Sequence, residues 1–215
     1  MTTTHPYPHR MQYQITQADY SALRTRLSAA VPEDSAGDIH TLLFTSYRNR
    51  VSAGPVGGLP AAHETEARFS LHYFDNDPSY LLLERRLDQD SDTVMMTEAE
   101  CRALLSGETD WLLERRNPIL HDFHSGLTER MLLPQVLLTY HREIYTLDGL
   151  DLWVALDSDI RASLQHMDFL DPELLARDTA GQEGRLLMEI SYSSVIPDHV
   201  LCLLDETAPR RKLLA

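Results

Sequence analysis

Alternating polar residues on several predicted β-strands are the side chains best suited to chemistry. Because successive strand residues point to opposite faces of a sheet, residues two apart share a face. Hydroxyl, imidazole, carboxylate and guanidinium groups recur in this way at Ser70, His72, Glu84, Arg86, Tyr140, Arg142, Glu189 and Ser191. The other face of each strand is apolar. This pattern fits a sheet with one face in water, or a closed barrel whose polar lumen gathers these groups.

A second candidate is a pair of histidines, His121 and His124, on one face of a predicted helix. Two imidazoles at this spacing could bind zinc if a third ligand approached. No cysteine or third histidine follows at ligand spacing, so an ordinary helix surface is the favoured interpretation. The sequence has no glycine-rich phosphate loop, nucleophile elbow or HExxH motif.

Strands predominate among the elements that must position these residues, and a helical segment interrupts them. The predicted strands are 11–15, 39–44, 68–74, 80–87, 136–145, 150–156 and 185–192, and the predicted helices are 16–31, 97–107, 111–116, 119–131 and 198–204. Thr97 and Glu100 form a capping box at the start of the helical segment. Consecutive strand pairs indicate an α+β fold with a mainly antiparallel sheet or barrel.

Composition limits the classes of function. The net charge of −14 argues against general nucleic-acid binding, which depends on neutralising phosphates with Lys and Arg. No apolar run approaches the ~20 residues that a membrane helix needs, and the first ten residues have no signal core. We therefore expect a loose tail at residues 1–8, one domain at 9–215 and a cytoplasmic protein, with association with a membrane through a partner as an alternative.

Short motifs occur in an order that resembles the vacuolar transporter chaperone (VTC) domain, the polyphosphate polymerase domain of the CYTH-like triphosphate-tunnel superfamily. Residues 9–15 resemble its opening Glu-x-Lys-Tyr strand, 39–44 its Ser-Leu-Tyr-Phe-Asp strand, 69–73 its Arg-x-Arg strand, 83–86 its Leu-Glu-x-Lys, 97–134 its helical insert, 140–145 its Tyr-x-Arg-x-x-Tyr, 156–161 its Phe-Asp-x-x-Ile-Arg and 187–192 its Leu-Glu-x-Lys-Tyr. The resemblance covers roughly residues 9–215.

The resemblance implies an antiparallel β-barrel of triphosphate-tunnel type with a helical insert. It also implies a phosphotransferase that moves the terminal phosphate of a nucleoside triphosphate onto a polyphosphate chain. Inward Arg and Lys would hold the phosphates, and inward carboxylates would hold manganese or magnesium. Such catalysis consists mainly of positioning and charge neutralisation.

Matching positions then receive roles by resemblance. Arg86, Arg142, Lys212 and His72 are the expected phosphate contacts; Glu189, Asp157 and Glu84 are the expected metal ligands; Arg86, Arg142 and Glu189 are the expected catalytic residues. For each charge the alternative is a wall salt bridge or a solvent-facing position. We expect the side chains of Ser70, His72, Glu84, Arg86, Arg142, Asp157 and Glu189 to converge on one lumen.

Other positions depart from the family pattern and remove positive charge. Gln12, Ser70, His72 and Ser191 stand where the family carries cations, Arg10 where it carries glutamate, Thr45 where it carries aspartate, and Trp153 where it often carries arginine. A charge-assisted hydrogen bond contributes roughly 1.5–3 kcal/mol. The expectation is therefore a polymerase with weakened activity, or a non-catalytic pseudoenzyme that binds an anion or a protein partner.

Overall fold

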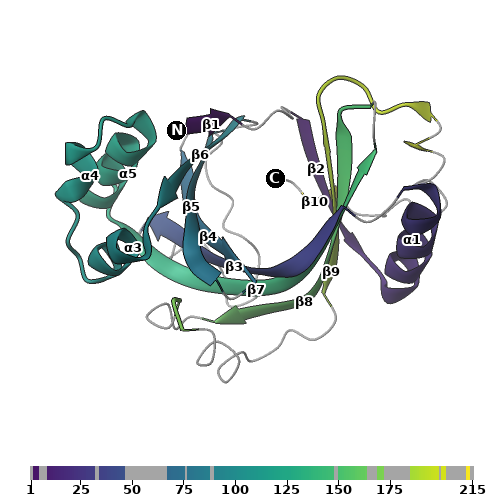
Figure 1. Cartoon of the computed structure of the whole chain (residues 1–215), viewed down its shortest axis with the longest axis horizontal. Helices are drawn as coiled ribbons and strands as arrows, with labels where there is room; N and C mark the ends of the chain where they lie inside the picture. Colours follow the sequence, from purple (N-terminus) through teal and green to yellow (C-terminus); the bar gives the residue numbers. More distant parts are fainter. Residues whose placement is uncertain are drawn as a thin grey trace. The chain divides into compact units, whose positions relative to one another are not determined.

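The computed structural model describes residues 2–4, 9–31, 34–46, 67–75, 77–87, 90–147, 150–163, 169–171, 185–198, 200–201 and 212–213 (Figure 1). The chain divides into two compact units, and each is described by itself. The first is drawn from Met1–His5, His40–Leu138 and Ser163–Thr179, and the second from Pro6–Ile39, Thr139–Ala162 and Ala180–Ala215. Strands β3 (Ser35–Ser46) and β7 (Leu132–Leu147) contribute residues to both.

The first unit is built on a strand order β1-β6-β5-β4-β3-β7. Its strands, besides β3 and β7, are β1 (Thr2–Thr4), β4 (Arg68–Phe74), β5 (Asp77–Leu87) and β6 (Asp90–Met96). The pairs β1–β6, β4–β5 and β5–β6 are antiparallel. On β4 the residues Phe69, Leu71 and Tyr73 are buried in the hydrophobic core, so the alternate residues form the opposite, polar face.

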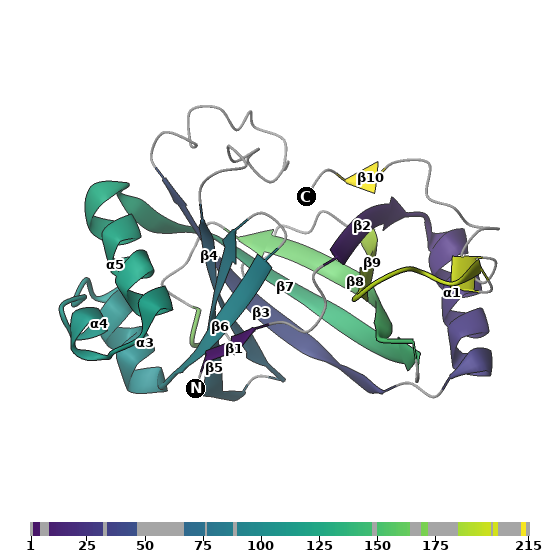
Figure 2. The same ribbon diagram turned by 90° about the horizontal axis from the view of Figure 1, so that it is seen from above.

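Three helices follow β6 and lie together in the first unit: α3 (Glu98–Leu105), α4 (Trp111–Glu114) and α5 (Pro118–Glu129) (Figures 1 and 2). Thr97 caps α3 and accepts a hydrogen bond from the Glu100 amide at 3.2 Å, and the Glu100 carboxylate accepts one from the Thr97 amide at 2.7 Å. Asn117 caps α5, where Pro118 occupies the first turn. Phe123 of α5 packs against Phe44 and Phe69, which joins the helices to the apolar face of the strands.

The second unit contains the strand order β7-β8-β9-β2-β10. Its further strands are β2 (His9–Ile15), β8 (Leu152–Ser163), β9 (Leu186–Tyr192) and β10 (Lys212–Leu213), and its helix is α1 (Gln17–Ala30). The pairs β2–β9, β8–β9 and β10–β2 are antiparallel. Its core includes Leu23 and Leu27 of α1 with Val154, Leu156 and Met188 of the strands.

A buried carboxylate fixes α1 to β7. Glu143 accepts hydrogen bonds from the Tyr20 hydroxyl at 3.0 Å, the Arg24 guanidinium at 3.0 Å and the Tyr145 hydroxyl at 2.9 Å. Burial, together with the Glu143 carboxylate, raises the pKa of both tyrosines, so their hydroxyls remain donors. Glu143 thus belongs to the packing of α1, whereas its neighbour Arg142 points to the other face of β7.

The predicted α+β class, antiparallel strands and helical insert are confirmed. Three strands were not predicted: the short strands β1 and β10 and the full strand β6. The sequence predicted a loose tail at Thr2–Thr4, but these residues form β1. The strand forms because three β-branched residues pair with the edge of β6. Strand β6 begins with Asp90-Ser91-Asp92. Because these residues are polar, the hydropathy pattern did not predict a strand there. No helix among the described residues is long and apolar enough to cross a membrane.

Candidate functional site

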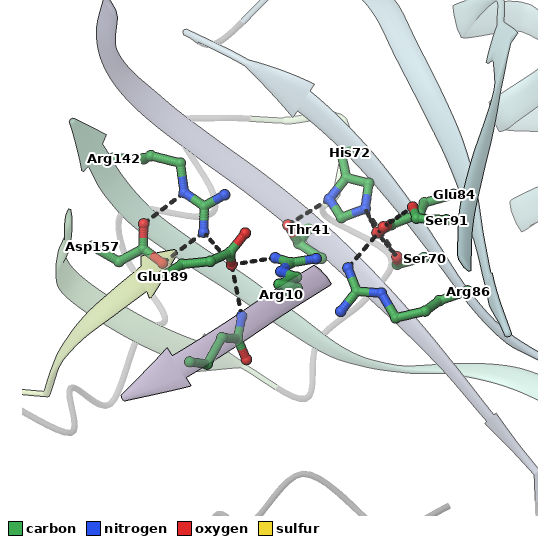
Figure 3. A network of polar contacts seen from close by, with 11 residues as sticks. Arg10, Thr41, Ser70, His72, Glu84, Arg86, Ser91, Arg142, Asp157 and Glu189 are labelled. Atoms are coloured by element: carbon green, nitrogen blue, oxygen red, sulfur yellow. Dashed lines mark hydrogen bonds and ion pairs between the residues drawn. The ribbon is translucent and has the colours of Figure 1, made fainter. Parts of the chain in front are cut away.

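Polar side chains gather in two groups, one in each unit (Figure 3). The Glu189 group, in the second unit, consists of Arg10, Gln12, Arg142, Asp157 and Glu189. The Glu84 group, in the first unit, consists of Thr41, Ser70, His72, Glu84, Arg86 and Ser91. Each group lies on the strand face opposite its unit's hydrophobic core.

Strand register brings the Glu189 group together. Glu189 on β9 lies opposite Gln12 on β2 and opposite Ala155 on β8. Asp157 is two residues beyond Ala155 and therefore shares its face. Arg10 of β2 and Arg142 of β7 both reach the Glu189 carboxylate. The residue opposite Glu189 on β8, Ala155, is small.

Arg142 forms ion pairs with both carboxylates of the Glu189 group. Its Nε donates to Asp157 Oδ1 at 2.6 Å, and its Nη2 donates to Asp157 Oδ2 at 2.7 Å, a two-pronged pairing of planar groups (Figure 3). Nη2 also lies 3.4 Å from Glu189 Oε2. The guanidinium additionally lies over the Tyr140 ring, 5.3 Å from its centroid. These contacts hold Arg142 in one orientation.

Glu189 receives its remaining donors from β2. Arg10 Nη2 forms an ion pair with Glu189 Oε2, and Gln12 Nε2 donates to the same oxygen at 2.8 Å. The Glu189 side chain is only 1% exposed. Within the described part of the chain, its other oxygen, Oε1, is buried and has no hydrogen-bond partner.

The charges of the group are strongly coupled. Burial raises the pKa of Glu189, but the positive charges of Arg10 and Arg142 outweigh burial and lower that pKa to about 2. Burial lowers the pKa of Arg142, whereas Asp157 and Glu189 raise it, and the net direction is upward. For Asp157, burial and the charge of Glu189 raise the pKa despite the attraction of Arg142. Glu189 is thus the more firmly ionised carboxylate.

The Glu84 group uses both oxygens of its carboxylate. Oε1 accepts from Arg86 Nη2 at 2.7 Å and from the Ser91 hydroxyl at 2.5 Å. Oε2 accepts from the Ser70 hydroxyl at 3.3 Å and lies 3.1 Å from His72 Nε2. Thr41 Oγ1 lies 2.9 Å from His72 Nδ1 on the other side of the ring (Figure 3).

These contacts assign the tautomer of a neutral His72. Because an ionised carboxylate only accepts, Nε2 carries the proton toward Glu84, and Nδ1 accepts from the Thr41 hydroxyl. A neutral imidazole brings no positive charge to this face, whereas a protonated one would.

Sequence patterning missed a further cation on the same face. Arg68 lies directly opposite Arg86 in the β4–β5 pair, and Ser70 lies directly opposite Glu84. Directly opposed residues share a face, so the side chains of Arg68 and Arg86 leave the sheet next to each other on this face. Arg68 is half-buried, and within the described residues its side chain forms no ion pair or hydrogen bond. Arg68 is two residues from Ser70 on the same strand, and this spacing could have predicted that it shares the polar face.

The divalent metal expected from the family pattern does not fit either group. Both oxygens of Asp157 and of Glu84 already accept from protein donors, and Glu189 Oε2 accepts from two arginines and a glutamine. Of these carboxylate oxygens, only Glu189 Oε1 has no hydrogen-bond partner among the described residues. Magnesium and manganese require several such oxygens. Among the described residues, no cluster of three or more His, Cys, Asp or Glu side chains is arranged to hold a metal.

The possible zinc pair also has another role. His121 Nε2 lies 2.9 Å from the Arg115 carbonyl oxygen, so this nitrogen donates a hydrogen bond to the backbone. The contact ties α5 to the end of α4. In the described part of the structure no third ligand joins His121 and His124.

The predicted site residues thus fall into two sets. Arg142, Asp157 and Glu189 contact one another in the second unit, and His72, Glu84 and Arg86 in the first. Lys212 lies in β10, opposite Tyr13, and the placement of its side chain is outside what the structure describes. Their phosphate-binding and catalytic roles, and their convergence on one lumen, remain predictions.

Comparison with known proteins identifies the fold. The sequence matches no protein-family model and no curated protein. The structure is similar to a putative adenylyl cyclase from Hippeastrum with a dominant triphosphatase activity, at 11% identity over 96% of this chain and 90% of that chain, with a TM-score of 0.54. The fold is that of the triphosphate-tunnel proteins. A putative adenylate cyclase from Bacillus halodurans is also similar, at 9% identity over 94% of this chain and 88% of that chain, with a TM-score of 0.51.

Removing Arg142 tests whether it holds the Glu189 group together. Arg142→Ala leaves Asp157 without its two-pronged partner in a buried position, so we expect a loss of about 3–5 kcal/mol in the free energy of unfolding. Urea denaturation followed by circular dichroism measures this loss.

Two matched variants separate the ion pair from general damage. Replacing both partners, Arg142→Met with Asp157→Leu, should cost less than Arg142→Ala alone, because no unpaired charge remains at Asp157. Arg161→Ala, at an exposed position of β8, should change stability by under about 0.5 kcal/mol. A loss below about 1 kcal/mol for Arg142→Ala would contradict a structural role for this arginine.

Proposed function

We propose that this protein binds a triphosphate or polyphosphate through the polar face of its first unit and transfers phosphate slowly. The finer identity, a nucleotide-dependent polyphosphate polymerase, rests on the resemblance to the VTC domain. The triphosphate-tunnel fold supports phosphate handling in general. The residues that would make the contacts are Arg68, Arg86 and His72.

The observation that carries this proposal is the juxtaposition of Arg68 and Arg86. Like charges directly opposite in a sheet destabilise it, and an anion seated between the two guanidinium groups would relieve that repulsion. Glu84 neutralises one of the two positive charges. Counting Arg68, Arg86 and Glu84, this face of the described residues retains one positive charge, and a protonated His72 would add another.

Arginine suits a phosphate ligand for geometric reasons. Its planar group offers paired N–H donors that match the oxygens of a phosphate, and each such charge-assisted bond is roughly twice as strong as a neutral one. The side chains of Arg86 and His72 are 26% and 18% exposed, so both remain accessible to a ligand. Ser70 and Ser91 supply neutral hydroxyl groups next to them.

Slow transfer follows from the charge balance of the Glu189 group. Phosphoryl transfer requires cations that neutralise the charge on the transferred group. Arg10 and Arg142 carry two positive charges, and Asp157 and Glu189 carry two negative ones, so these four residues sum to zero. Both arginines are engaged with protein carboxylates, so binding a phosphate there requires breaking existing pairs.

A second candidate is a non-catalytic domain that binds an anion or a protein partner, including a membrane-protein partner. The internal neutralisation of the Glu189 group favours it, because a site that holds its own counter-ions has little need of a substrate's charges. The two candidates share the anion contact in the first unit. They differ in turnover.

Calorimetry with inorganic triphosphate, without added metal, tests the anion contact. Arg68→Ala and Arg86→Ala should each weaken binding at least about tenfold, since each removes one charge-assisted contact. Arg68→Ala should not lower the melting temperature of the free protein, because it removes a like-charge pair.

Arg102→Ala is the matched control. Arg102 lies on α3 in the same unit, its side chain is 62% exposed, and it pairs only with its helical neighbour Glu98. Its removal should leave triphosphate affinity unchanged. Binding of triphosphate that survives both Arg68→Ala and Arg86→Ala would place the contact elsewhere.

Turnover distinguishes the two candidates. We expect nucleotide-dependent polyphosphate synthesis, assayed with manganese, to be at least about a hundredfold slower than that of a family member with all its cations, since about 1.4 kcal/mol of transition-state stabilisation corresponds to a factor of ten. Restoring Gln12→Lys, Ser70→Arg, His72→Arg and Ser191→Lys together should raise the rate in protein shown to be folded. Rapid synthesis by the unmodified protein would refute the weakened activity, and no synthesis together with triphosphate binding would favour the non-catalytic candidate.

A further inference from the structure

We propose that Arg10 is a resident counter-ion that replaces a divalent metal in the Glu189 group. The buried carboxylates of Glu189 and Asp157 need positive charge nearby, and two arginines of this chain supply it. The charge of the group would therefore be balanced without manganese or magnesium. This inference concerns the metal requirement of the second unit and does not depend on triphosphate binding.

The contacts show where the positive charge lies. Glu189 Oε2 receives the Arg10 guanidinium, the Gln12 amide and, at the longer distance of 3.4 Å, Arg142 Nη2. Asp157 is fully occupied by the two donors of Arg142. A metal ion bound through Asp157 or Glu189 Oε2 would have to displace these N–H donors. Among the described residues only Glu189 Oε1 is left without a hydrogen-bond partner, and a single oxygen is fewer than a divalent ion requires.

Strand register explains why Arg10 can take this place. Arg10 lies opposite Ser191, two residues from Glu189 on the same face of β9. Ser191 is small and 1% exposed, so the long arginine side chain can extend past it toward the carboxylate. Gln12, directly opposite Glu189, adds a neutral donor where a lysine would add another charge.

Charge balance makes a bound divalent ion unfavourable. The two arginines and two carboxylates sum to zero, and adding a divalent cation would leave two uncompensated positive charges in a largely buried group. Uncompensated buried charge is strongly disfavoured. Replacing Arg10 with glutamate changes the sum from zero to minus two and adds two carboxylate oxygens, so the same position should then attract a divalent ion.

Manganese alone is the probe, with binding measured by electron paramagnetic resonance of free Mn²⁺ in the absence of any phosphate. The unmodified protein should show no saturable site up to about 1 mM Mn²⁺, whereas Arg10→Glu should bind one ion with at least about tenfold higher affinity than that limit. Thermal denaturation of Arg10→Glu should shift upward when Mn²⁺ is added and return when a chelator is added.

Further variants keep the test decisive. Arg10→Gln removes one charge with little change in shape and serves where Arg10→Glu does not fold, with a weaker but measurable Mn²⁺ site expected. Arg161→Ala, which removes an exposed charge of β8, should bind no Mn²⁺. Saturable Mn²⁺ binding by the unmodified protein that Glu189→Gln abolishes would overturn the proposal, and so would folded Arg10→Glu and Arg10→Gln proteins that bind none.

Discussion

The pairing of Glu189 with two arginines is the constraint on which the second unit depends. A carboxylate with a 1% exposed side chain cannot remain ionised without nearby positive charge. Arg10 from β2 and Arg142 from β7 provide that charge, and Arg142 also binds Asp157 from β8. One buried charge on β9 is thereby linked to three other strands. The loss of one arginine would leave a carboxylate buried without its partner, so these residues hold the sheet together as well as forming a candidate site.

The two units manage charge in different ways. In the second unit the positive and negative groups of the Glu189 group cancel, and the donors point at protein oxygens. In the first unit, Arg68 and Arg86 lie opposite each other while Glu84 offers a single negative charge. A fold shared with a protein of dominant triphosphatase activity thus keeps an excess of positive charge on one polar face and neutralises the other internally. In the proposed function, this difference separates anion binding in the first unit from phosphate transfer.

Much of the fold could be predicted because hydrophobic alternation and capping residues are local signals. Strand β4 has the predicted limits, and Thr97 caps α3 as expected. The partners of the charged residues could not be predicted, because they depend on strand register. The sequence analysis treated Arg10 only as a departure from a family glutamate. Across the β2–β9 pair, however, Arg10 forms an ion pair with Glu189. Arg68 stands out only once β4 and β5 are aligned.

The central claim is that Glu189 is ionised and held by arginines, and its own titration tests this most directly. The two cations lower the pKa of Glu189 from 4.5 to about 2. The stability that this group contributes is therefore fully present above its ordinary pKa, and it is lost progressively as the pH falls from there through the folded-state pKa. In carbon-13 NMR with labelled glutamate, assigned through Glu189→Gln, the Glu189 carboxyl signal should not shift between pH 7 and about pH 4 while amide signals report a folded protein. A titration midpoint at or above its ordinary value of 4.5 in the folded protein would contradict the account.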